Sequence, residues 1–103
     1  MLVRYQPAKD IKFKFSDRIS KKLKNKHDVT EDEVKECFHN SNGVVLEDTR
    51  EEHATNPPTQ WFIAETNSGR KLKVVYVEDQ AIYIKTAYEP NEVEIYIFNK
   101  FSK

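Results

Sequence analysis

Three apolar segments in close succession between residues 61 and 86 constrain the fold of this chain more than any other feature. Each is rich in β-branched and aromatic residues, as strands are, and the segments are 61–66, 71–77 and 81–86. Two turn-forming stretches, Asn-Ser-Gly at 67–69 and Glu-Asp-Gln at 78–80, lie between them. The pattern predicts an antiparallel meander of three strands. In its middle strand we expect one face to carry Leu72, Val74 and Tyr76 and the other to carry Lys71, Lys73, Val75 and Val77.

The N-terminal half predicts a strand followed by two helices. Residues 11–15 alternate apolar and basic side chains, which is typical of a half-buried strand. Ser16 then provides a suitable N-cap for a first helix. Thr30 and Glu33 have the spacing of a capping box, so a second helix is expected over 31–39.

The C-terminal half contains one expected loop and one ambiguous segment. Residues 47–59 have no apolar period and include Asn-Pro-Pro, so we expect a loop there that is long for so small a domain. In the final segment Val93, Ile95 and Ile97 alternate with Glu94, Tyr96 and Phe98, as they would in a strand. The segment also places Val93, Ile97 and Phe101 on one stripe of a helix that starts after Pro90. Periodicity alone does not choose between the two.

Length and composition bound the class of protein. A chain of 103 residues forms one small core, so we expect a single domain over 1–103 with a loose arm at 1–9. No apolar run approaches the roughly 18 residues that a membrane-spanning helix needs, and no secretory signal is visible. Cys37 is the only cysteine, which excludes an intramolecular disulfide and fits a reducing cytoplasm. We expect a cytoplasmic protein that does not bind membranes, with Cys37 as a partly buried side chain rather than a nucleophile.

Several common kinds of site have no support in the sequence. The three histidines have no partner at metal-ligand spacing, and one cysteine cannot form a zinc cluster. Gly43 and Gly69 are the only glycines, so there is no glycine-rich phosphate loop. We therefore expect neither a metal nor a small-molecule cofactor.

A net charge of zero conceals a strongly basic segment. Residues 12–26 contain seven Lys and Arg residues against one acidic residue, Asp17, while 28–36 contain five acidic residues against Lys35. The basic segment leads directly into the start of the second predicted helix, and helix N-termini attract anions. This layout is typical of a surface that binds phosphates, although many ordinary domains contain similar blocks.

The order of these features resembles the BrnT family of bacterial toxins, within the wider RelE-like group of small ribonucleases. The resemblance rests on Lys-His-Asp-Val-Thr at 26–30, an apolar helix ending in Phe38, a charged loop, Gly-Arg at 69–70, and a terminal segment with Glu and Tyr. It extends from about residue 22 to residue 96. It implies an α+β fold, with N-terminal helices packed on a small antiparallel β-meander and a helix at the C-terminus. It also implies a metal-independent endoribonuclease toxin that cleaves RNA and is neutralised by a cognate antitoxin protein.

RNA cleavage through the 2′-hydroxyl requires a base, a cation beside the phosphate and an acid for the leaving oxygen. The resemblance places Arg70 as a phosphate clamp and His27 as the general acid or base. From the chemistry of the residues themselves, we expect Lys85 to hold a phosphate as a point charge and Tyr88 to stack on a base or donate a proton. The residues expected to bind RNA are Lys22, Lys24, Lys26, Arg50 and His53. Each has an ordinary structural alternative, such as a solvated hairpin residue for Arg70.

The third predicted strand departs from the family pattern. The family carries arginines around the Ala that ends this strand, whereas residues 85–89 here read Lys-Thr-Ala-Tyr-Glu. Without those arginines, and with zero net charge, a second hypothesis stays open. The chain would then be a non-catalytic protein-binding module of the same fold.

Overall fold

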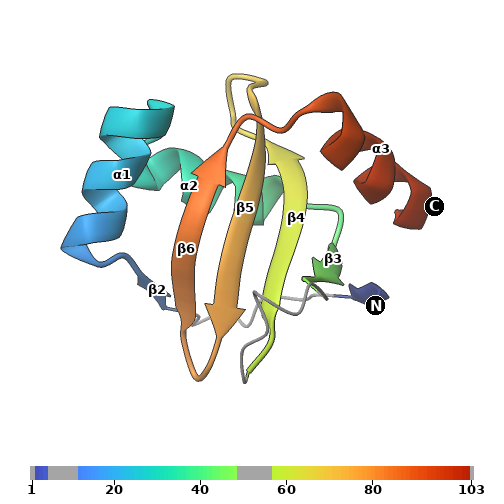
Figure 1. Cartoon of the computed structure of the whole chain (residues 1–103), viewed down its shortest axis with the longest axis horizontal. Coiled ribbons are helices and arrows are strands. Elements are labelled where there is room, and N and C mark those ends of the chain that lie inside the picture. Colours follow the sequence, from blue (N-terminus) through green and yellow to red (C-terminus); the bar gives the residue numbers. More distant parts are fainter. Residues whose placement is uncertain (1, 5–11, 49–56, 103) are drawn as a thin grey trace.

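The computed structural model describes residues 2–4, 12–48 and 57–102, in which helices pack against one mixed sheet (Figure 1). The helices are α1 (Asp17–His27), α2 (Glu31–Asn40) and α3 (Glu92–Phe101). The strands are β1 (Leu2–Arg4), β2 (Phe13–Lys14), β3 (Val44–Glu47), β4 (Thr59–Glu65), β5 (Lys71–Glu78) and β6 (Ile82–Tyr88). The α+β class predicted from the sequence is confirmed.

The predicted meander forms the centre of the sheet, whose order is β1-β3-β4-β5-β6-β2. β4, β5 and β6 pair antiparallel, as expected. Two features differ from the prediction. The N-terminal segment expected as a loose arm contains β1, which pairs with β3, and the strand expected over 11–15 is reduced to β2, which runs parallel to β6. Both elements are held by pairing with distant strands, which local periodicity does not reveal.

The first two helices begin where the capping signals place them. Ser16 caps α1 by accepting a hydrogen bond from the Ile19 amide, and Thr30 and Glu33 form a complete capping box at the start of α2. α1 is followed by its C-cap residue Asp28, which has a left-handed backbone with φ of 53°. This conformation suits Asn, Asp and Gly, and it turns the chain sharply into α2.

The core lies between α2 and one face of the sheet. Phe38 of α2 is at its centre, with ring centroids 4.8 Å from Phe62, 4.9 Å from Phe13 and 5.2 Å from Tyr76. These separations are typical of aromatic pairs in edge or tilted contact. The alternation expected in β5 is observed, because Leu72, Val74 and Tyr76 are all fully buried on this face.

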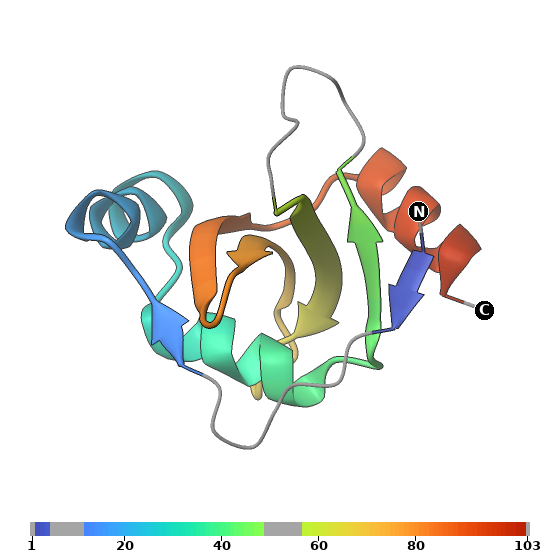
Figure 2. The same cartoon turned by 90° about the horizontal axis from the view of Figure 1, so that it is seen from below.

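The opposite face of the sheet, called the outer face, is flanked by α1 beside β6 and by α3 beside β4 (Figures 1 and 2). Its side chains come from alternate positions of the three central strands and include Trp61, Ile63, Lys73, Val75 and Tyr88. Of these side chains, Trp61, Ile63 and Lys73 are buried, whereas Val75 and Tyr88 are half-buried.

The C-terminal segment is the helix that the resemblance implies, but its apolar stripe does not pack on the sheet. Phe98 makes the buried contact, and Ile95 is half-buried. Val93, Ile97 and Phe101 remain 65%, 37% and 44% exposed. The helix is therefore rotated relative to the stripe seen in the sequence, and it presents apolar side chains outward.

In the described ranges no helix combines the length and apolar character required to cross a bilayer.

Candidate functional site

Two of the predicted catalytic residues meet at one end of the outer face. His27 is the last residue of α1 and Tyr88 is the last residue of β6. Their ring centroids are 5.5 Å apart at an interplanar angle of 42°, and both side chains are half-buried. The sequence predicted each residue separately, and packing of α1 beside β6 brings them together.

Tyr88 belongs to a second group, the Glu94 cluster, made of Lys73, Tyr88 and Glu94. The Tyr88 hydroxyl donates to Glu94 Oε2 at 2.9 Å, and the Lys73 ammonium donates to the same oxygen at 2.7 Å. Glu94 also accepts the Asn91 amide through Oε1, as part of the α3 capping box. One carboxylate therefore joins β5, β6 and the first turn of α3.

Lys73 is unusually buried for a lysine, with 8% of its surface exposed. Its ammonium nitrogen lies 4.4 Å from the centroid of the Trp61 ring and 5.7 Å from that of Tyr88. A desolvated cation is stabilised by a carboxylate partner and by aromatic faces, and this site provides both. Trp61 in turn packs on Phe98 at 6.1 Å between centroids and is 9% exposed, so it is a packing residue and not a free platform for a base.

The electrostatics of the site set the protonation state of each group near neutral pH. Partial burial lowers the pKa of His27 below its ordinary 6.5, and the nearby positive charges of Lys22 and Lys26 lower it further. Burial and the hydrogen bond to Glu94 raise the pKa of Tyr88. Burial alone would raise the pKa of Glu94, but hydrogen bonds from Lys73, Asn91 and Tyr88 lower it overall. Near pH 7 the imidazole is thus neutral, the phenol is protonated and the carboxylate is ionised.

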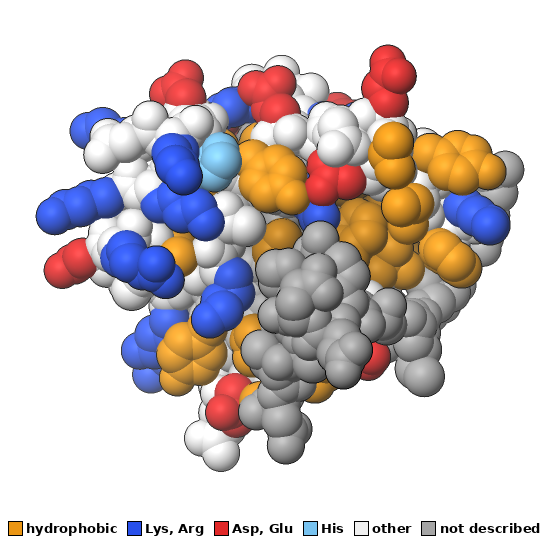
Figure 3. Space-filling view, viewed as in Figure 1, with side chains coloured by type: hydrophobic (Ala, Val, Ile, Leu, Met, Phe, Trp, Pro, Cys, Tyr) orange, Lys and Arg blue, Asp and Glu red, His pale blue; other side chains and the backbone are white. Residues whose placement is uncertain are grey.

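The three lysines of α1 that were predicted to bind RNA lie on different sides of the helix. Lys22 and Lys26 are one turn apart, and both act electrostatically on His27. Lys24 lies about half a turn away from Lys22 around the helix and is exposed. Figure 3 shows Lys and Arg side chains gathered on the α1 side of the outer face and hydrophobic side chains on the α3 side. Lys22 and Lys26 therefore belong to the site, whereas Lys24 points elsewhere.

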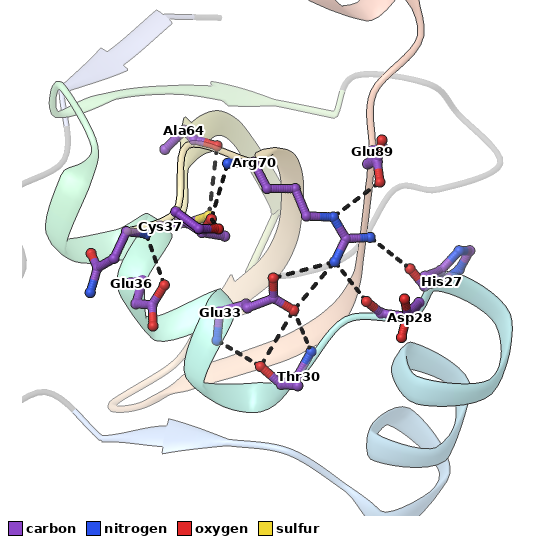
Figure 4. A network of polar contacts seen from close by, with 12 residues as sticks. His27, Asp28, Thr30, Glu33, Glu36, Cys37, Ala64, Arg70 and Glu89 are labelled. Carbon is purple, nitrogen blue, oxygen red and sulfur yellow. Dashed lines mark hydrogen bonds and ion pairs between the residues drawn. The ribbon is translucent and has the colours of Figure 1, made fainter.

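The guanidinium of Arg70 is bound by protein acceptors on several sides rather than left open to a ligand (Figure 4). Its guanidinium donates to the His27 carbonyl at 3.0 Å and to the Asp28 carbonyl at 2.6 Å, the last groups of α1. It also pairs with Glu33 at 3.3 Å and with Glu89 at 3.0 Å. Burial alone would lower the pKa of Arg70, but the hydrogen bonds to Glu89 and Glu33 raise it. This set of contacts, the Arg70 network, commits the guanidinium to protein acceptors.

Lys85 is exposed on β6, three residues before Tyr88. It lies at a bulge, because Thr86 pairs with Val75 and Ile84 with Tyr76, leaving Lys85 without an opposite residue. Bulges redirect side chains and often occur beside functional sites. Along an extended strand, three residues place its Cα about 10 Å from that of Tyr88. Arg50 and His53, also predicted to bind RNA, lie outside the described residues.

Lys73 and Glu94 are the members of this site that the sequence did not single out. Lys73 was recognised as facing the outer side of β5, but a lone lysine in a strand is usually solvated. Glu94 had a usable signal, because Asn91 and Glu94 have the spacing of a capping box. Their convergence on Tyr88 depends on how α3 docks, which the sequence does not specify.

The thiol of Cys37 and the possible metal-binding side chains bear on two other kinds of site, a cysteine nucleophile and a metal centre. Cys37 is fully buried and donates to the Ala64 carbonyl at 3.6 Å. Burial, with the negative charges of Glu33 and Glu36, raises the pKa of its thiol to about 12, so it is a packing residue rather than a nucleophile. Among the described residues, no three His, Cys, Asp or Glu side chains are grouped so that they could hold a metal ion.

Comparison of the chain with models of protein families, with curated proteins and with solved structures gave no significant match.

Proposed function

We propose that this protein is a metal-independent endoribonuclease that acts on RNA in the cytoplasm, with its site at the His27 end of the outer face. The observation that carries the proposal is the convergence of an imidazole, a phenol and a carboxylate–ammonium pair around Tyr88. These groups come from four separate elements, α1, β5, β6 and α3, and are partly desolvated. Such a set supplies the base, acid and charge stabilisation that cleavage through a 2′-hydroxyl requires.

In the proposed reaction the 2′-oxygen of a nucleotide attacks the adjacent phosphorus, and the 5′-oxygen of the next nucleotide leaves. His27 takes the 2′-hydroxyl proton, and its lowered pKa keeps it in the basic form near pH 7. Tyr88 breaks its hydrogen bond to Glu94 and gives its proton to the leaving oxygen. Afterwards His27 releases the proton that it took to solvent, and the phenolate regains one from solvent. The products are a 2′,3′-cyclic phosphate and a free 5′-hydroxyl.

The remaining charged residues have supporting roles in this proposal. Lys22 and Lys26 attract the phosphates beside His27, and exposed Lys85 does so further along β6. Glu94 orients the Tyr88 hydroxyl and is itself fixed by Lys73. Arg70 is a positioning residue rather than the phosphate clamp expected from the sequence, because it holds the end of α1 that carries His27.

The resemblance further suggests that the nuclease is the toxin of a toxin–antitoxin pair. A second candidate function, a protein-binding module without catalysis, is favoured by one observation. Val93 and Tyr96 are 65% and 68% exposed on α3, beside Ile97 and Phe101. Contiguous exposed apolar side chains often mark protein-binding surfaces. Binding of a cognate antitoxin to α3 would be compatible with both candidate functions.

The decisive experiment incubates bulk cellular RNA with purified protein in EDTA. We expect cleavage by the parent chain, a loss of at least about 100-fold in His27→Ala and in Tyr88→Phe, and little change in the control Lys24→Ala. Products that end in 2′,3′-cyclic phosphate would identify the mechanism. Intact RNA, both alone and with ribosomes present, would refute the nuclease and leave the binding module.

The toxin role has a separate test in bacteria. Induced expression should arrest growth, and His27→Ala should relieve the arrest while the protein accumulates normally. Growth arrest that survives His27→Ala but is lost in Ile97→Asp would favour the binding module instead.

A further inference from the structure

A pocket of about 650 Å³ lies beside the Glu94 cluster. It is bounded by the end of α2, the C-terminal half of β4 and the side of α3 that carries Ile95 and Phe98. Its polar lining is mainly asparagine, including Asn67 and Asn99, and its apolar lining is mainly isoleucine and phenylalanine. The pocket exists because β3 pairs with β4 only at Trp61 and Gln60, so β4 continues past its neighbour. A volume of this size is in the range of sites that hold small ligands.

The polar lining consists mainly of asparagine side chains with unused hydrogen-bonding capacity. The amide nitrogen of Asn40 donates to the Glu65 carbonyl and to Asn67 Oδ1, and Asn42 Oδ1 accepts from the Val44 amide. Within the described chain, no bond uses the Asn40 oxygen, the amide nitrogens of Asn42 and Asn67, or either side-chain atom of Asn99. Donors and acceptors therefore both remain for a ligand.

The charge and shape of the pocket narrow the class of ligand. Among the described residues that line the pocket, the charged ones are Glu65 and Lys71. They are opposite in sign and are register partners on β4 and β5, so this part of the lining is neutral overall. Ile63, Ile95 and Phe98 supply an apolar wall. A neutral ligand with a flat apolar body and mixed donor and acceptor edges matches these features, and a nucleobase has this chemistry. Asparagine is well suited to such edges because its amide forms paired hydrogen bonds with them.

The geometry points to a base-binding subsite, in which this pocket holds one unstacked nucleobase of the RNA; the inference rests on the proposed function. Lys71 lines the pocket and Lys73 belongs to the Glu94 cluster, and both occupy the outer face of β5. Two residues of a strand span about 7 Å. On α3, Ile95 of the pocket directly follows Glu94 of the cluster. A base in the pocket therefore belongs to a nucleotide close to the scissile phosphate.

The test uses the full chain and single nucleosides, so that binding is measured apart from cleavage. Adenosine, guanosine, cytidine and uridine are titrated separately into ¹⁵N-labelled protein, and the side-chain amide signals of the asparagines are followed by NMR. Ribose 5-phosphate is the control ligand. At least one nucleoside should shift the Asn99 signal saturably at millimolar concentration, while ribose 5-phosphate should not.

Variants connect binding to the pocket. Affinity of that nucleoside, followed at the Asn67 signal, should fall at least about tenfold in Asn99→Leu, which keeps the volume but removes the amide. It should be unchanged in Asn25→Leu, an exposed amide of α1 outside the pocket, and in His27→Ala.

If RNA is cleaved in a His27-dependent manner but no nucleoside perturbs these signals, the subsite is wrong and the nuclease stands. If nucleosides bind here and RNA stays intact, the subsite stands and the nuclease fails. Saturation by ribose 5-phosphate in place of nucleosides would overturn the base assignment.

Discussion

Replacing Arg70 with alanine should destabilise the fold, because this one side chain joins four separate segments. Its guanidinium binds the two carbonyls that end α1, the first turn of α2 at Glu33, and Glu89 beyond β6. Hydrogen bonds from a charged donor contribute about 1.5–3 kcal/mol each when well shielded, and exposed ion pairs contribute about 0–1 kcal/mol. The Arg70 side chain is 24% exposed, and the Glu33 and Glu89 side chains are 22% and 66% exposed.

The two carbonyl contacts therefore dominate the expected loss, and Glu89 adds little. We expect Arg70→Ala to lower the free energy of unfolding by about 2–4 kcal/mol, which corresponds to about 10–20 °C in Tm for a domain of this size. Arg70→Lys should recover less than half of the loss, because an ammonium cannot reach all these acceptors with the geometry of the guanidinium fork.

Urea unfolding measures this directly, since Trp61 is the only tryptophan and is 9% exposed in the folded chain. The matched control is Arg18→Ala, which removes an exposed arginine from the first turn of α1 and should change stability by less than about 0.5 kcal/mol. If Arg70→Ala also changes the free energy of unfolding by less than about 0.5 kcal/mol, the Arg70 network contributes nothing measurable to stability. The guanidinium would then be free enough to serve as the phosphate clamp that the sequence suggested.

Three further predictions follow from the core, the helix caps and the site. Phe38→Ala should cost about 3–5 kcal/mol in urea unfolding, because the ring lies at the centre of the aromatic core, whereas Phe38→Leu should cost clearly less. Thr30→Ala should cost about 1 kcal/mol by removing one half of the α2 capping box, and an unchanged stability would refute this. The pKa of His27, followed by ¹H NMR titration, should rise towards its ordinary value in Lys26→Gln, because a nearby positive charge is removed. The same titration in Lys24→Gln should match the parent chain.

The sequence predicted well those parts of the fold that depend on neighbouring residues. The capping box at Thr30 and the alternation in β5 involve residues within one turn or one strand, so local chemistry determines them. β1 and the rotation of α3 were not predicted, because distant partners set both. The stripe of Val93, Ile97 and Phe101 is a sound helical pattern, yet the helix packs through Phe98.

The candidate site shows the same division. The resemblance predicts His27, and the chemistry of the third strand's residues predicts Tyr88; the fold brings the two within ring contact. The resemblance predicts that Arg70 clamps a phosphate. The sequence cannot show that α1 ends beside this hairpin arginine and supplies the acceptors that it binds. Lys73 was placed on the correct face of β5, but its burial under α3 and its bond to Glu94 are properties of tertiary packing.

Two glutamates connect the helix starts to the site. Glu33 accepts the Thr30 amide in the α2 capping box and also binds Arg70, which holds the end of α1. Glu94 accepts the Asn91 amide in the α3 capping box and also binds Tyr88 and Lys73. Each carboxylate thus satisfies an amide that its helix would leave unpaired and fixes a group of the site with the same side chain. Fraying of either helix start would release a contact of the site, so the local stability of these first turns limits how well His27 and Tyr88 are held together.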